Sequence, residues 1–291
     1  MDASPPQRTI AGPAVVRGFG YWSGRDVCLE FRPAPADSGM VFVRADLPGC
    51  PRIPASIDYR CDTPRRTSLR CGSATVEMVE HVLAALAGLG IDNCEVWCDQ
   101  PEMPGGDGSA LPFVEALQGA GLVELGAPRA RRVVQQVVRL GTPDSWIEAR
   151  PARRPGTHLC YELDYGPQSP IARQAHGVWL SPEVFCRELA PCRTFMLREE
   201  AEWLLAQGFG RRASPRDLLV FGPGGPIDNS LRFPNECARH KVLDMVGDLA
   251  LGQAHWIGEF RAYRSGHRLN AELVHRLIKE TPLVRAWKHC A

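Results

Sequence analysis

Three observations predict an α+β protein. The chain has 291 residues, which at about 150 residues per domain suggests two domains. In each half, segments with alternating apolar residues precede one with helical spacing. Each of the two long helical segments ends at a glycine, Gly90 or Gly252, and runs directly into a strand-like segment. The sequence therefore predicts two similar α+β sandwich domains that pack face to face, with the functional site between them.

The first half begins with strands and turns. Apolar residues then recur at helical spacing from residue 73 to Leu89, and Gly90 is a candidate cap for the end of this helix. The strands predicted in this half from alternation and from flanking turn residues are 27–31, 40–43 and 93–97.

A break rich in glycine, proline and arginine at residues 125–132 separates the halves. We place the domain boundary there, which gives domains 1–128 and 129–291. The second half repeats the order of the first, with a long helix predicted at 235–251. Its predicted strands are 133–140, 145–149, 159–163 and 254–263.

Composition excludes several classes of protein. Lys plus Arg (34) nearly equals Asp plus Glu (33), and the net charge of +1 gives no general field for a nucleic acid or an anionic membrane. No signal peptide is recognised, and the longest nearly apolar run, 82–91, is too short to cross a bilayer. We therefore expect a soluble, cytoplasmic protein. Its 11 cysteines include no Cys-x-x-Cys pair, so we expect reduced thiols outside any metal site.

The segment 239–248 is the most informative for chemistry. His240, Asp244 and Asp248 are spaced at i, i+4 and i+8, so on a helix they form one polar row. A histidine and a carboxylate one turn apart can bind one metal ion. Charged helix faces are common, however, and a solvated face is the more frequent explanation of such a row.

Two further segments carry candidate groups. Glu80 and His81 lie beside the apolar stripe of the first helix, and His81 could be a third ligand that leaves one metal position open, as in a catalytic site. A half-buried structural histidine is the alternative. His267 follows Gly266 in a turn after a strand, where it is a candidate general acid or a solvated side chain. No P-loop, dinucleotide fingerprint, nucleophile elbow or redox cysteine pair is present.

Taken together, these segments resemble, in order along nearly the whole chain, the UDP-3-O-acyl-N-acetylglucosamine deacetylases of lipid A biosynthesis. The segments that carry the resemblance are 79–93, 107–114, Arg193-Thr194-Phe195, 239–249 and 265–270.

This resemblance implies a zinc-dependent amidohydrolase that removes the acetyl group from the sugar nitrogen of a UDP-linked acylated amino sugar. It implies one Zn2+ per chain, with Fe2+ as the alternative ion, and we expect a monomer. The metal ligands it assigns are His81, His240 and Asp244. Its other site residues are Glu80 as general base, His267 as the group that protonates the amine or stabilises charge, Asp248 to orient His267, and Thr194 at the oxyanion.

Substrate contacts are also implied. Phe195 and Lys241 would line the substrate site, and Tyr165 occupies a position similar to that of the family's uracil-stacking aromatic. Because the net charge is only +1, the diphosphate must be held by a few cations such as Lys241 and Arg264.

The chain departs from the family pattern at three places. Trp22 stands where the family has a histidine, Gly105-Gly106 replaces an apolar pair, and Arg211-Arg212 lies in the segment similar to the insert that passes the acyl chain. These departures leave the acyl chain open. The alternatives are therefore a deacetylase of a different UDP-N-acetyl sugar and a catalytically silent protein that binds a sugar nucleotide.

Overall fold

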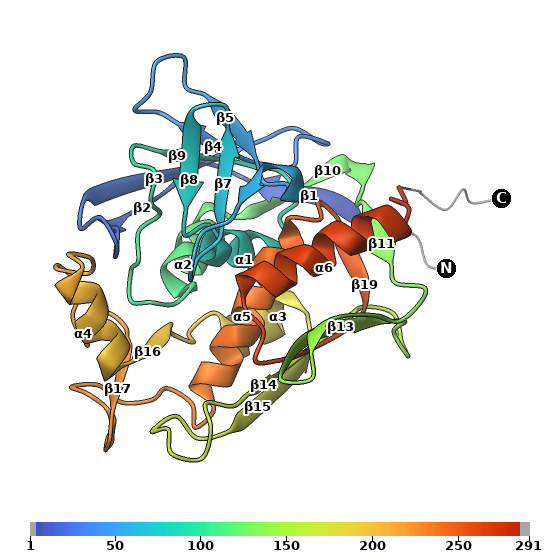
Figure 1. Ribbon diagram of the computed structural model, residues 1–291. Coiled ribbons are helices and arrows are strands. Elements are labelled where there is room, and N and C mark those ends of the chain that lie inside the picture. The colour runs from blue at the N-terminus through green and yellow to red at the C-terminus, as the bar shows by residue number, and fades with distance from the viewer. Residues whose placement is uncertain (1–3, 286–291) are drawn as a thin grey trace.

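The computed structural model describes residues 4–285 and shows an α+β fold with two large sheets (Figure 1). The first has the order β2-β3-β9-β4-β5. Its strands are β2 (Ala14–Phe19), β3 (Asp26–Pro33), β9 (Cys94–Cys98), β4 (Met40–Arg44) and β5 (Arg52–Pro54). The second has the order β12-β13-β19-β14-β15, with β11 also paired to β19. Its strands are β11 (Arg131–Val133), β12 (Val138–Thr142), β13 (Ser145–Arg150), β19 (His255–Tyr263), β14 (Thr157–Leu163) and β15 (Gln174–Trp179).

Both sheets have the same connectivity. Along each order the successive pairs are antiparallel, antiparallel, parallel and antiparallel. In each, the central strand is the last to be added, after a helix: α1 (Glu80–Leu89) precedes β9 and α5 (Glu236–Ala250) precedes β19. The α+β class is thus confirmed, and the faint similarity of the halves has a structural counterpart. The boundary at residue 128 stays a prediction.

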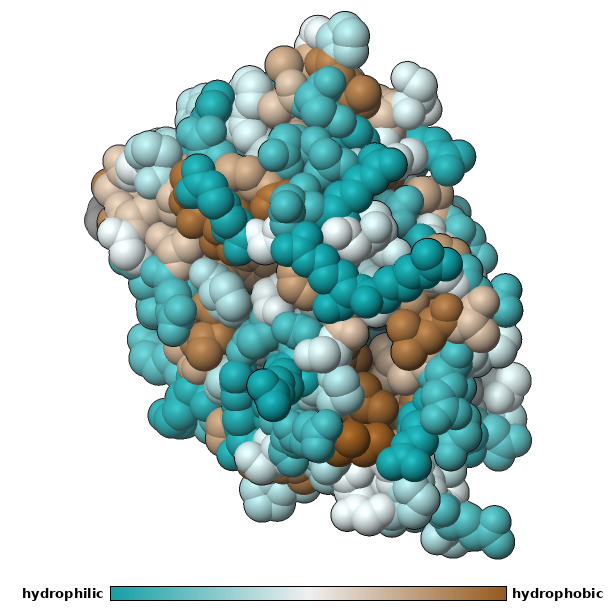
Figure 2. Space-filling view, turned by 90° about the vertical axis from the view of Figure 1, so that its left-hand side faces the viewer, coloured by the Kyte–Doolittle hydropathy of each residue, from teal (hydrophilic) through white to brown (hydrophobic). Residues whose placement is uncertain are grey.

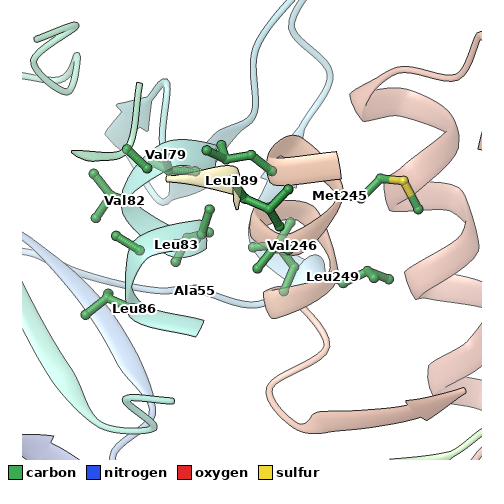
Figure 3. Packing of buried hydrophobic residues seen from close by; sticks show 14 of the residues in the cluster. Ala55, Val79, Val82, Leu83, Leu86, Leu189, Met245, Val246 and Leu249 are labelled. Carbon is green, nitrogen blue, oxygen red and sulfur yellow. The ribbon is translucent and has the colours of Figure 1, made fainter. Parts of the chain in front are cut away.

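Helices α1 and α5 pack against each other between the two sheets (Figure 1). Figure 3 shows Leu83 of α1 and Val246 of α5 in the space between the two helices. The crossing is close at Gly247, where a Cβ would lie 2.1 Å from the carbonyl oxygen of Glu80. Only glycine leaves room for this approach.

Each long helix ends for a different local reason. Gly90 has φ 73°, and its N–H donates to Ala87, so it forms the left-handed cap that the sequence predicts. At the end of α5, a Cβ on Gly252 would lie 2.5 Å from the ring of Trp256, whose indole N–H donates to the carbonyl of Leu249 at 2.8 Å. The second glycine therefore makes room for a buried tryptophan.

Several predicted boundaries are wrong. Residues 74–77 form a strand, and α1 begins only at Glu80 because Met78 has a left-handed φ of 58°. The break at 125–132 overlaps the second half of β10 (Leu122–Pro128), which pairs with β1 (Pro6–Ile10), and the strand predicted at 133–140 is interrupted between β11 and β12. The turn expected around His267 is the start of a 14-residue helix, α6 (His267–Glu280).

Smaller elements surround this framework. A hairpin sheet contains β6 (Arg60–Cys61), β7 (Ser68–Cys71) and β8 (Ala74–Glu77). A peripheral unit, which projects from the body of the molecule in Figure 1, contains β16 (Phe195–Leu197), α4 (Arg198–Ala206), β17 (Leu219–Gly222) and β18 (Gly225–Pro226). The remaining helical segments are η1 (Ile57–Tyr59), α2 (Leu111–Ala120), α3 (Pro182–Val184) and η2 (Phe185–Leu189).

Two expectations from composition can be compared with the structure. All ten cysteines within residues 4–285 are free, and none belongs to the candidate metal group; Cys290 lies outside the described residues. None of the helices in that range combines the length and the apolar character that a membrane span requires.

Candidate active site

A cavity of about 900 Å3 lies between the two halves and the peripheral unit. Its lining contains polar residues of both central helices, among them Glu80 and His81 of α1 and His240 and Asp244 of α5. His267, at the start of α6, completes this polar end. The structure thus brings together residues that are nearly 190 positions apart in the sequence.

His81, His240 and Asp244 form a group that can hold a metal ion. One ligand atom from each lies within 4.8 Å of the others, and all three residues are buried. Oδ1 of Asp244 is 3.7 Å from Nε2 of His81 and 3.4 Å from Nε2 of His240. This oxygen is buried without a hydrogen-bond partner among the described residues. A divalent cation would satisfy it, and two imidazoles with one carboxylate are donors that zinc accepts.

The orientation of His240 supports a ligand role. Its Nδ1 lies 3.0 Å from the carbonyl oxygen of Cys192, which can only accept, so Nδ1 carries the proton and Nε2 presents its lone pair towards Asp244. Burial lowers the pKa of His240 to about 4. The ring is therefore neutral near pH 7, as a metal ligand must be.

Lys241 neutralises part of the charge of this group. Its Nζ donates to Oδ2 of Asp244 at 2.6 Å. Burial opposes both charged forms, yet Lys241 and His240 hold the pKa of Asp244 well below its usual range. The same carboxylate keeps the pKa of Lys241 above its usual range despite burial. Asp244 thus remains ionised, with one oxygen on the ammonium and the other turned to the two imidazoles.

Asp248 holds the ring of His267 in place. Its Nδ1 lies 2.9 Å from Oδ2 of Asp248, and its Nε2 lies 4.0 Å from Oε1 of Glu80 and 3.9 Å from Oδ2 of Asp244. Burial alone would lower the pKa of His267, but Asp248 and Asp244 raise it to about 9. The imidazole is therefore a cation near neutral pH. Burial raises the pKa of Glu80 above its usual range, which favours proton uptake.

Sequence reasoning missed two partners of these groups. Thr67 donates its N–H to Oε2 of Glu80 at 2.9 Å and its hydroxyl to Oδ1 of Asp248 at 2.6 Å. Asn270 donates its amide to Oδ2 of Asp248 at 2.8 Å. Had α6 been predicted, the position of Asn270 one turn after His267 would have pointed to it. No local sequence pattern indicated Thr67, because only the fold brings it near Glu80 and Asp248.

The remaining predicted residues line the cavity. Thr194, Phe195, Tyr165 and Arg264 do so with Lys241. Phe195 lies edge-on to the His240 ring, and Tyr165 lies edge-on to Phe195, with ring centres 6.1 Å apart in both pairs. Tyr165 is 41% exposed, so its ring is open to a ligand. Asp248 is fully buried behind His267 and is the one predicted site residue outside the lining.

The unusual turn near the N-terminus forms part of the apolar wall. Trp22 packs edge-on against Phe209, with ring centres 5.5 Å apart. The neighbouring Tyr21 explains one of the glycines, since a Cβ on Gly105 would lie 2.1 Å from the Tyr21 ring. Figure 2 looks onto the side on which α4 lies and shows hydrophobic patches between hydrophilic side chains. Trp203, Leu205 and Phe209 are exposed large apolar residues in or just after α4.

Comparisons with known proteins agree with the geometry. The family model described as UDP-3-O-acyl N-acetylglycosamine deacetylase matches residues 7–279. A UDP-3-O-acyl-N-acetylglucosamine deacetylase of Anaeromyxobacter sp. (strain Fw109-5) is 42% identical, over 94% of this chain and 89% of the relative. A protein of the same name from Thermosynechococcus vestitus is 40% identical over 94% of both chains, and one from Shewanella sp. (strain W3-18-1) is 35% identical over 94% and 90%.

Proposed function

The chain belongs to the UDP-3-O-acyl-N-acetylglycosamine deacetylase family, and we propose that it hydrolyses the N-acetyl group of a UDP-linked 3-O-acyl-N-acetylglucosamine in lipid A biosynthesis. The observation that carries this proposal is the convergence of three ligand atoms within 4.8 Å at the polar end of one cavity. Glu80 and His267 flank this group from two different elements. Such a set suits hydrolysis of an amide, which is a poor electrophile.

His81, His240 and Asp244 would hold one ion per chain, with Zn2+ as the expected metal and Fe2+ as the alternative. Bound zinc supplies Lewis acidity, which polarises the acetyl carbonyl and makes water a better nucleophile near neutral pH. Lys241 keeps Asp244 ionised for this purpose. The Cys192 carbonyl keeps Nε2 of His240 free for the metal.

Glu80 is the proposed general base. Its Oε2 already accepts the N–H of Thr67, which leaves Oε1 to take the proton of the attacking water. A base of this kind contributes about 10²-fold to 10⁴-fold to the rate. Since Oε1 lies 4.0 Å from Nε2 of His267, the proton acceptor and the cation stand side by side at the reacting centre.

His267 is the proposed proton donor to the departing amine. Asp248 accepts from Nδ1, so the second ring proton is on Nε2, which faces the cavity. The same cation would stabilise negative charge as it develops on the acetyl oxygen. We assign the hydroxyl of Thr194 to that oxygen, because Thr194 lines the cavity at the edge of the peripheral unit.

Four residues are proposed to recognise the sugar nucleotide. Tyr165 offers an exposed ring for uracil, and Phe195 continues that aromatic surface towards His240. Arg264 and Lys241 are the cations proposed for the diphosphate. Nζ of Lys241 has three protons and uses one on Asp244, so a substrate oxygen can still bind there.

Mass spectrometry of the reaction products tests the proposal directly. Zinc-loaded protein should convert the acylated UDP-N-acetylglucosamine into a product that has lost one acetyl group, and metal analysis should find about one ion per chain. UDP-N-acetylglucosamine without the acyl chain, run in parallel, separates the alternative substrate class. An unchanged substrate mass with fully loaded protein would contradict the assignment.

A further inference from the structure

Thr67 contacts both carboxylates that work with His267 and the attacking water. It lies between the loop at 62–66 and β7, and its exposed fraction is 0%. Its N–H donates to Oε2 of Glu80 and its hydroxyl to Oδ1 of Asp248, at 2.9 Å and 2.6 Å. Its own carbonyl accepts the N–H of Val79 at the start of α1. This one residue, directly before β7, therefore ties α1 of one half to α5 of the other.

The hydroxyl of Thr67 completes the hydrogen bonding of Asp248. The other oxygen of this carboxylate, Oδ2, accepts from Nδ1 of His267 and from Asn270, whereas Oδ1 accepts only from Thr67 among the described residues. Asp248 is fully buried, so no solvent molecule stands ready to replace a lost donor. With both oxygens bonded, the plane of the carboxylate is fixed, and with it the ring of His267.

The two contacts of Thr67 can be separated by mutation. The bond to Glu80 comes from the backbone and survives any side-chain replacement except proline. The bond to Asp248 comes from the hydroxyl and is removed in valine, which has nearly the same shape. Thr67 is not part of the cavity lining, so the residue can affect the reaction only through its neighbours.

We infer that Thr67 is a positioning residue of the proposed deacetylation, whose hydroxyl fixes Asp248 so that Nε2 of His267 faces the reacting centre. This inference rests on the proposed function. Loss of the hydroxyl should misorient the cation that assists the leaving amine, while ligands and substrate contacts stay in place. The effect should therefore fall on the chemical step rather than on binding.

The test compares steady-state kinetics of four zinc-loaded full-length proteins: wild type, Thr67→Val, Thr67→Ser and Thr281→Val. A hydrogen bond to a charged group corresponds to about 10-fold to 100-fold in rate. We expect kcat of Thr67→Val to fall by that factor, with KM within about twofold and an unchanged zinc content. Thr67→Ser, which restores the donor, should recover kcat to within about threefold of wild type.

Thr281→Val is the matched control, because Thr281 is also buried and its hydroxyl donates to a carbonyl, that of Leu277, at 2.6 Å. It should leave kcat unchanged. The inference is overturned if Thr67→Val keeps the wild-type kcat, if its loss appears only in KM or in zinc content, or if serine fails to rescue.

A spectroscopic measurement separates this inference from the proposed function. In zinc-loaded protein, the Nδ1 proton of His267 bonded to Asp248 should give a downfield NMR resonance, assigned by its absence in His267→Gln. In Thr67→Val this resonance should shift or broaden, and in Thr67→Ser and Thr281→Val it should not. An inactive wild type would refute the proposed function alone, and an unchanged resonance in Thr67→Val would refute the positioning role alone.

Discussion

Replacing Gly247 by alanine should push α1 and α5 apart. This would move the candidate ligand on α1, His81, away from His240 and Asp244 on α5. A Cβ at this position would lie 2.1 Å from the carbonyl oxygen and 2.9 Å from the carbonyl carbon of Glu80. Ordinary contacts need at least about 3.4 Å, so α1 and α5 must move apart by about 1 Å. Both partners are on the backbone of packed helices, so no side-chain rotation relieves the overlap.

The expected magnitudes follow from this displacement. Alanine in place of glycine within a helix would by itself stabilise the fold by about 0.5–1 kcal/mol, whereas overpacking of a dense core costs about 1–3 kcal/mol. The 2.1 Å overlap with the backbone of Glu80 puts Gly247→Ala at the upper end of the overpacking range, so we expect a net loss of about 2 kcal/mol in the free energy of unfolding. Since an error of 1 Å in a catalytic site can cost about 10²-fold, we expect kcat/KM to fall by that factor and zinc affinity to fall with it.

Chemical denaturation, zinc titration and deacetylation kinetics provide the assay, with Gly119→Ala as the control. Gly119 lies in α2, has ordinary helical geometry and would meet no atom within 4 Å if it carried a Cβ. Gly119→Ala should be neutral or stabilising and fully active. If Gly247→Ala behaved in the same way, with wild-type zinc affinity, the close crossing would not control the geometry of the site.

Three further predictions concern charges and metal. Arg193→Met leaves the fully buried carboxylate of Glu236 without its ion pair and should lower the free energy of unfolding by about 3–5 kcal/mol in urea denaturation. Burial, with Arg129 and Arg131, lowers the pKa of His255 to about 4, so the unfolded chain binds the extra proton between about pH 6.5 and 4. Stability should be lost as the pH falls through that window, and His255→Gln should reduce this loss by up to about 3 kcal/mol, since each pKa unit corresponds to about 1.4 kcal/mol. Removal of zinc by a chelator should lower the unfolding temperature, whereas free zinc at 100 times its dissociation constant should add about 2.7 kcal/mol.

The control variants replace exposed residues of the same type. Arg268→Met removes a surface pair with Glu272 and should change stability by less than about 0.5 kcal/mol. His81→Ala should abolish the zinc dependence of unfolding, and His275→Ala, at an exposed position of α6, should preserve it. A zinc effect that persisted in His81→Ala would argue for binding elsewhere.

The parts of the molecule predicted correctly are those with a local signal. Alternating apolar residues identified β3, and the i, i+4, i+8 row identified the polar face of α5. Its position made His81 one candidate for a third ligand, and only the resemblance assigned it to that row, because no local pattern indicates that α1 crosses α5 at Gly247. The same limit applied to Thr67, whose two acceptors lie 13 and 181 residues away.

The starts of α6 and α1 were predicted wrongly because one local pattern was given more weight than another. In α6, Leu269, Leu273 and Leu277 recur every fourth residue, yet Ser265-Gly266 indicated a turn. The glycine does precede the helix as its cap, and the helix follows at once. At the start of α1, the apolar Met78 fits the helical spacing but has left-handed backbone geometry that ends β8 instead.

Because the site lies on α1 and α5, other parts of the protein can change in sequence more freely than these helices. These helices lie in the centre of the fold, where backbone amides should exchange with solvent most slowly. The facing wall, by contrast, belongs to the peripheral unit, whose short sheet stands apart from the two large ones. Substitutions or insertions in that wall can therefore reshape the space offered to an acyl chain while the reactive groups stay fixed. In such a molecule, selectivity can drift during evolution without loss of the chemistry.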